Sequence, residues 1–64
     1  MNPIYKHIRA AYKAGEFSNL RTEVGSGGMC AVYAGSKFLK VYASKLIAER
    51  DIAVQQSKAA KFIQ

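Results

Sequence analysis

The N-terminal segment alternates apolar and basic positions at helical spacing. Its apolar residues fall on one face of a helix: Ile4, Tyr5, Ile8, Ala11 and Tyr12. The opposite face carries Lys6, Arg9 and Lys13. Asn2 suits the N-cap, Pro3 suits the first helical position, and Gly15 is a natural stop. The pattern predicts a short amphipathic helix, with His7 as a packing residue at the edge of its apolar face.

The middle of the chain has the two-residue periodicity of strands. Three strands are predicted, separated by glycine-containing turns: Leu20–Val24, Met29–Ala34 and Phe38–Tyr42. Alternation in the third strand places two sets of residues on opposite faces: Phe38, Lys40 and Tyr42 on one, Leu39 and Val41 on the other. Both connections are short, which predicts an antiparallel meander.

The last third predicts a helix from Ser44, a suitable cap, to about Phe62, because no Pro or Gly interrupts it. Two apolar rows run along this helix: Leu46, Ala53 and Ala60, and Ala48, Ile52, Ala59 and Ile63. Glu49 and Gln56 fall between the rows. A carboxylate turned toward the core is costly unless a cation meets it. Glu49 is therefore expected either to pair with a cation or to lie at an exposed edge.

Together these elements predict an α+β fold, with a short N-terminal helix, a three-stranded antiparallel meander and a long C-terminal helix packed on one face. The chain has 64 residues, half of them hydrophobic, so we expect one folded domain over residues 1–64. A domain of this size has a thin stability margin, which a partner subunit could supplement. A homo-oligomer is compatible with the sequence.

The charge balance is strongly basic, with ten Lys and Arg against four Asp and Glu and a formal net charge of +6. This favours nucleic acid, an acidic protein surface or phosphate as partner, although solubility alone would also account for it. Cys30 is the single cysteine, so no internal disulfide can form and a reducing compartment is expected. The longest apolar run, Met29–Ala34, is far shorter than the roughly 20 residues that span a bilayer. We expect a cytoplasmic location and no membrane association.

The glycine-rich stretch from Gly25 to Gly28 is the segment best suited to carry chemistry. A Walker loop needs a Lys that is missing here, and a dinucleotide fingerprint needs a following helix where a strand is predicted. Backbone N–H groups of a glycine-rich turn can approach phosphate oxygens closely. One His and one Cys cannot build a structural zinc site, and no metal or cofactor is expected. No tandem aromatic and basic stripe predicts a stacking platform for single-stranded nucleic acid.

The stretch Gly25-Ser26-Gly27-Gly28-Met29-Cys30-Ala31-Val32-Tyr33 resembles the start of a protein-kinase domain, where G-x-G-x-x-G-x-V joins the first two strands. The first two glycines and Val32 match, whereas Cys30 replaces the third glycine. Lys40 resembles the third-strand lysine of kinases, and Glu49 the helix glutamate that pairs with it, at a shorter spacing than usual. The small kinase-like proteins of tailed phages, with similarly compressed strands, are the nearest likeness.

The resemblance implies a nucleotide- or phosphate-binding site made of residues from the turn, the third strand and the last helix: Gly25, Ser26, Gly27, Gly28, Lys40 and Glu49. Phosphoryl transfer also needs a positioned base and Mg²⁺ ligands. No H-R-D-type loop or D-F-G segment occurs in these 64 residues, so we expect no enzymatic activity.

The expected function is therefore a non-catalytic, kinase-N-lobe-like module that binds and modulates another protein. The phage likeness is compatible with a phage-encoded protein that acts on a host factor. The alternative is a basic nucleic-acid-binding protein with little sequence preference, which would use Lys6, Arg9 and Lys13. A third interpretation is a truncated nucleotide-binding fragment.

Overall fold

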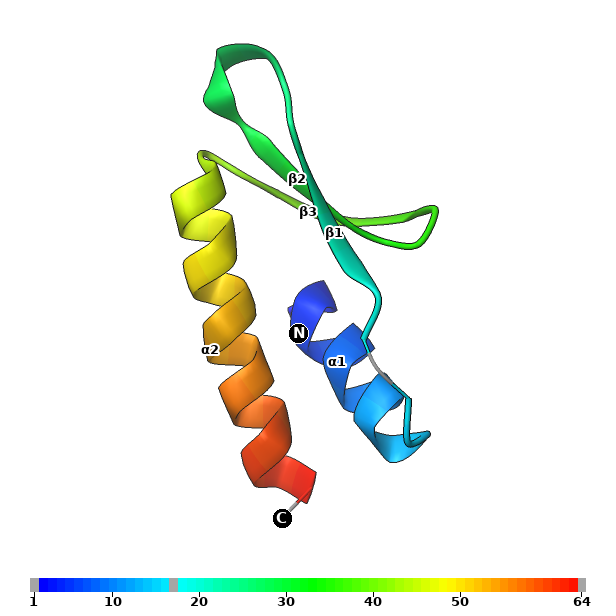
Figure 1. The fold of residues 1–64 in the computed structure, drawn as a ribbon. Coiled ribbons are helices and arrows are strands. Elements are labelled where there is room, and N and C mark those ends of the chain that lie inside the picture. The colour runs from blue at the N-terminus through cyan, green and yellow to red at the C-terminus, as the bar shows by residue number, and fades with distance from the viewer. Residues whose placement is uncertain (1, 17, 64) are drawn as a thin grey trace.

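The computed structural model describes residues 2–16 and 18–63, with side chains up to Lys61. Along the chain, the elements are α1 (Pro3–Lys13), β1 (Leu20–Val24), the short 3₁₀ turn η1 (Ser26–Gly28), β2 (Cys30–Ala34), β3 (Lys37–Tyr42) and α2 (Lys45–Ile63) (Figure 1). The α+β fold predicted from the sequence is confirmed: a short helix, a three-stranded antiparallel sheet and a long helix that packs on the sheet.

Both helices begin where the sequence predicts. The Asn2 side chain caps α1 by accepting a hydrogen bond from the backbone N–H of Ile4 at 2.8 Å. After Lys13 the chain leaves the helix, and Gly15 takes a φ of +72°, which glycine adopts without strain. At α2, the backbone N–H of Ile47 donates to Ser44 Oγ at 3.3 Å. Local capping chemistry therefore fixes the helix boundaries.

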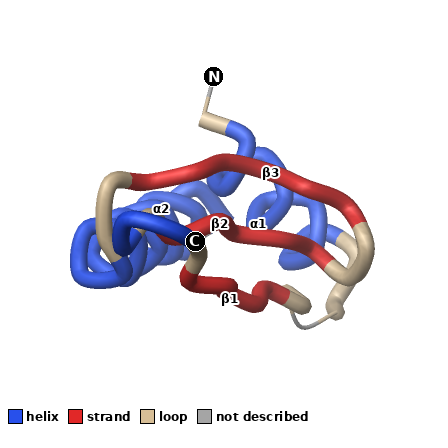
Figure 2. Tube along the Cα trace, turned by 90° about the horizontal axis from the view of Figure 1, so that it is seen from above, coloured by secondary structure: helices blue, strands red, loops and turns tan. Residues whose placement is uncertain are grey.

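The sheet has the order β1–β2–β3, with β2 in the centre (Figure 2). Both pairs are antiparallel, and at one end Val24, Cys30 and Tyr42 lie side by side. Both helices lie on the same side of the sheet, below it in Figure 1. They pack against each other and leave the opposite face of the sheet uncovered by helix.

A β-bulge corrects the predicted faces of β3. Val32 pairs with Lys40, but the next residue of β2, Tyr33, pairs with Phe38, so Leu39 is an extra residue in β3. The bulge reverses the alternation of side chains in β3, because one extra residue shifts the side chains that precede it to the opposite face of the sheet. The prediction that Phe38 shares a face with Tyr42 is therefore wrong: Tyr42 is buried, whereas Phe38 is 53% exposed.

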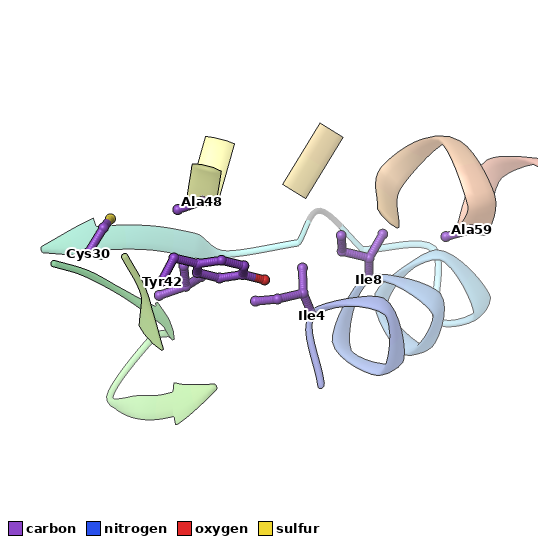
Figure 3. Close-up of a cluster of buried hydrophobic side chains, with 7 residues drawn as sticks. Ile4, Ile8, Cys30, Tyr42, Ala48 and Ala59 are labelled. Carbon is purple, nitrogen blue, oxygen red and sulfur yellow. The ribbon is translucent and has the colours of Figure 1, made fainter. Parts of the chain in front are cut away.

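The core lies between the sheet and the two helices (Figure 3). Its buried members come from four elements: Ile4, Ile8, Cys30, Val32, Tyr42, Ala48 and Ala59. Tyr42 sits centrally, with its ring between Cys30 and Ile4 and its hydroxyl directed toward the Ile4 side. α2 contributes two alanines to this core, so it supplies little apolar volume of its own.

α2 contacts the rest of the fold along one row of residues. Ala48 and Ala59 are buried and Ile52 is partly buried, as predicted for one of the two apolar rows. The other predicted row is wrong for two of its three members, because Leu46 is 58% exposed and Ala53 is exposed, whereas Ala60 is partly buried. A helix turns about 100° per residue, so the stripe that faces α1 and the sheet cannot include both rows. The side chain of Ile63 lies outside the described residues.

Neither helix, over the residues described, is long and apolar enough to cross a membrane.

Candidate functional site

Asp51 of α2 joins three elements of the fold. Its carboxylate accepts hydrogen bonds from Asn2 Nδ2 at 3.0 Å, from Gln55 Nε2 at 2.8 Å and from the hydroxyl of Tyr42. These partners lie at the start of α1, one turn further along α2 and at the end of β3. We call this group the Asp51 network. It holds the two helices and the sheet in register at the point where all three meet.

The ionisation of the Asp51 network follows from its surroundings. Burial alone would raise the pKa of Asp51, but the hydrogen bonds from Tyr42, Gln55 and Asn2, together with the charge of Lys40, outweigh it and lower the pKa. Burial and the bond to Asp51 raise the pKa of Tyr42 well above its usual value. Asp51 is therefore a carboxylate, and Tyr42 a neutral phenol, over the whole physiological pH range.

The lowered pKa of Asp51 predicts acid sensitivity. A carboxyl group whose folded pKa is depressed stabilises the fold above its unfolded pKa, near 3.9, and loses that contribution as pH falls through the folded value. We expect the free energy of unfolding to drop below about pH 4 in the wild type and to drop less in Asp51→Asn. Urea unfolding at a series of acid pH values measures this difference. Equal slopes in the two proteins would show that Asp51 does not contribute.

Lys40 lies near Asp51 and not near the acid that the sequence suggested. Its Nζ sits 5.0 Å from the centroid of the Tyr42 ring, and its charge lowers the pKa of Asp51. Among the described residues, no ion pair or hydrogen bond joins Lys40 to Glu49. The acid of α2 whose pKa is influenced by the third-strand lysine is therefore Asp51, two residues further along the helix.

Glu49 is exposed, which agrees with the second of its two expected positions, an exposed edge of the helix, and not with a buried ion pair. It lines a shallow hollow with residues of β1 and α2: Ser18, Leu20, Arg21, Thr22, Ile52, Ala53 and Gln56. Lys40 and the glycine-rich turn do not line this hollow. The nucleotide- or phosphate-binding site expected from the glycine-rich turn, Lys40 and Glu49 is therefore not assembled around Glu49.

The glycine-rich turn is exposed at the tip of the β1–β2 hairpin, where the sequence predicts it. Gly27 and Gly28 have φ values of +73° and +81°, so a side chain at either position would be strained. Two backbone N–H groups are already used inside the turn, by Gly25 donating to Met29 O at 2.8 Å and Gly28 to Gly25 O at 3.2 Å. Ser26 and Gly27 are left as the amides that could meet a phosphate.

The three predicted basic residues of α1 do come together. Lys6, Arg9 and Lys13 line one hollow on the helix surface with Ala10. Lys6 and Lys13 are exposed, and Arg9 is partly buried. α1 therefore presents a continuous row of cations, with its apolar residues Ile4, Ile8 and Ala11 turned to the core.

Side chains across all three strands form a stack on the face of the sheet that no helix covers. The Arg21 guanidinium lies 4.4 Å from the Tyr33 ring centroid, and Tyr33 meets Phe38 edge to face at 5.8 Å. Arg21 also donates to Glu23 at 2.7 Å and to the carbonyl of Gly35 at 2.9 Å. The sequence pattern does not reveal this set, because the bulge that brings Phe38 to this face has no clear signal in the sequence.

Asp51 was also missed, although a signal was present. It follows the buried Ala48 by three residues and precedes the buried Gln55 by four, so all three share one row of the helix. In the described part of the chain, no group of three or more His, Cys, Asp or Glu side chains could hold a metal ion, and the Cys30 thiol is buried and free.

No protein-family model, curated protein or solved structure matches this chain. Its class is therefore defined by the fold and its surfaces: a small basic α+β domain with one uncovered sheet face and a cationic first helix.

Proposed function

We propose that this chain is a non-catalytic, kinase-N-lobe-like module that binds and modulates another protein. The observation that carries the proposal is the large amount of apolar surface left uncovered. The buried core is small, whereas large apolar side chains of the described residues are exposed on both helices, on β1, on β3 and just before β2: Tyr12, Val24, Met29, Phe38, Val41, Leu46, Ile47 and Val54. A short chain needs most of its apolar side chains for its own core. The exposed apolar surface is therefore best explained by contact with a partner protein.

The face of the sheet opposite the helices is the part of this surface best suited to a protein partner. It contains what we call the outer sheet patch: Ala31, Tyr33, Phe38 and Val41. Tyr33 pairs with Phe38 and Ala31 with Val41 across adjacent strands, so the patch is continuous. The charges of Arg21 and Glu23 beside it cancel in an ion pair. An aromatic, electrically neutral patch suits an apolar protein surface better than a phosphate backbone.

The arrangement of elements also supports the likeness to a kinase N-lobe. A strand, a glycine-rich turn, two further antiparallel strands and a helix follow one another in the order that kinases use. The third-strand lysine, Lys40, lies in the electrostatic field of an acid on that helix, Asp51. Because Asp51 is tied to Asn2, Tyr42 and Gln55, it holds the fold together and is not a free ligand group.

A matched pair of variants tests the proposal. Val41→Lys places a charge in the outer sheet patch at a side chain that is 45% exposed, and Val54→Lys makes the same change on α2 at 48% exposure. We expect Val41→Lys to lower the affinity for the partner at least about tenfold, because a charge buried at an interface must be desolvated. Val54→Lys is expected to leave the affinity unchanged.

The partner is first captured from nuclease-treated bacterial lysate with immobilised wild-type chain, and its affinity for each purified variant is then measured by calorimetry. Circular dichroism of both variants confirms that they are folded. Equal binding by Val41→Lys and wild type would contradict the role of the patch. Loss of every captured protein after nuclease treatment would contradict protein binding itself.

A further inference from the structure

We infer that the chain has a second binding site, a pocket between α1 and β3 that holds the phosphodiester backbone of a single-stranded nucleic acid. The pocket has a volume of about 350 Å³. α1 supplies one wall and the start of β3 the other: Pro3, Lys6, His7 and Ala10, and Lys37, Phe38 and Leu39. We call it the α1–β3 pocket. It goes beyond the proposed protein-binding function and shares only Phe38 with the outer sheet patch.

The charge of the α1–β3 pocket is wholly positive. Lys6 and Lys37 enter it from opposite walls, and no acidic residue lines it. In the part of the chain that the structure describes, neither ammonium group has an ion pair or a hydrogen bond. Two cations that face one pocket without a counterion repel each other, and an anion between them removes that cost.

His7 provides a second and independent indication of a ligand. Its Nε2 atom is buried and has no hydrogen-bond partner, and the residue lines the same pocket. A buried polar atom without a partner is destabilising, and a hydrogen bond to a ligand in the pocket would remove that cost. With its proton on Nε2, the imidazole donates to a phosphate oxygen, as Lys6 and Lys37 do.

The surroundings of the pocket favour a polymer over a single phosphate. A second hollow, lined by Lys6, Arg9, Ala10 and Lys13, shares Lys6 and Ala10 with the first and continues along α1. From Lys6 to Lys13 the helix rises by about 10 Å. The row is therefore long enough to contact more than one phosphate of the same strand, which a single phosphate ion could not use.

Phe38 favours a single strand over a duplex. It is 53% exposed and lines the α1–β3 pocket next to Lys37. An exposed aromatic ring beside a phosphate site can stack an unpaired base with little sequence preference, whereas the bases of a duplex are already stacked on each other. The fold thus assembles the aromatic and basic combination that does not occur as a continuous stripe in the sequence.

The test compares two double variants that remove the same charge. Lys6→Ala with Lys37→Ala empties the pocket of its cations, while Lys45→Ala with Lys61→Ala removes two exposed lysines of α2. Affinity is measured by fluorescence anisotropy with a labelled single-stranded oligonucleotide of mixed sequence over a series of salt concentrations. We expect the first variant to bind about tenfold more weakly. The slope of log affinity against log salt concentration should become shallower by about 1.4, since each phosphate contact on a single strand contributes about 0.7 to that slope. The second variant should bind nearly as wild type.

A pair of variants at His7 refines the assignment. His7→Leu removes the donor and should weaken binding several-fold, whereas His7→Gln keeps an N–H donor and should restore most of the affinity. Circular dichroism verifies the fold of each variant. Equal losses in the two lysine double variants would overturn the inference, because binding would then depend on net charge alone.

Three further probes distinguish a single-stranded nucleic acid from other ligands that could occupy the pocket. Equal affinity for a duplex would overturn the assignment of a single strand. Inorganic phosphate is then added as a competitor. If it displaces the oligonucleotide at a concentration equal to that of the phosphate groups in the oligonucleotide, the pocket is a site for free phosphate. Tighter binding of a phosphoserine peptide than of the oligonucleotide would overturn the assignment of nucleic acid.

Discussion

Replacing Asp51 with alanine is expected to lower the free energy of unfolding by about 2–4 kcal/mol. The change removes the acceptor for Asn2, Gln55 and Tyr42, of which Gln55 is only 6% and Tyr42 only 8% exposed. A buried donor left without a partner costs about 1–3 kcal/mol, and two are created here. Small domains have total stabilities near the low end of about 5–15 kcal/mol, so a large share of the stability would be lost.

Urea unfolding followed by circular dichroism measures this effect, and Glu49→Ala is its control. Glu49 is an exposed acid on the same helix, so its removal changes the net charge equally and should cost no more than about 0.5 kcal/mol. If Glu49→Ala proved as destabilising as Asp51→Ala, the hydrogen bonds of the Asp51 network would not explain the loss. Such a result would also restore Glu49 as the structural partner of β3.

Ile8→Ala is the other change with a large expected effect, about 2–5 kcal/mol of lost stability. Ile8 is fully buried and belongs to the one apolar cluster that joins α1 to the sheet and α2. The cavity left by its side chain cannot be filled by α2, which contributes Ala48 and Ala59 to the core. We expect α1 to detach from the remainder of the fold well before the sheet unfolds.

Ile47→Ala is the matched control for Ile8→Ala, because it deletes the same atoms from an isoleucine that is 47% exposed. Its cost should stay near 1 kcal/mol or below. Hydrogen exchange of the α1 amides in Ile8→Ala locates the weakened region. Equal destabilisation by the two variants would mean that α1 is not packed as described.

The fold follows from the sequence because its boundaries depend on local chemistry. Asn2, Pro3 and Gly15 define α1 without reference to the rest of the molecule. The positive φ values of the glycines at 27, 28 and 35 suit the two hairpin turns. Such signals act over a few residues, so they can be recognised in a single sequence.

The binding surfaces were harder to predict, because they depend on contacts between distant elements. α2 has apolar residues around much of its circumference, so its sequence pattern alone does not identify which row of residues faces the core. For the same reason it does not show that Asp51 lies on the row that faces the core. Phe38 reaches the outer face only because of the bulge at Leu39. Lys37 approaches Lys6 and His7 only once β3 packs beside α1, since thirty residues separate the two segments.

The hydrogen bond between Asn2 and Asp51 also has a consequence for how the chain folds. It joins residues 49 positions apart, so α1, which is synthesised before α2, reaches its final position only after α2 has formed. The β1–β2–β3 meander pairs only strands that are neighbours in sequence, so it can form early. Complete docking of α1 has to wait for α2, and it carries the entropic cost of closing most of the chain into a loop. During synthesis, Ile4 and Ile8 can contact the sheet but stay partly exposed until the residues around Ala59 have left the ribosome. An α1 held by a chaperone in that interval would delay completion of the core.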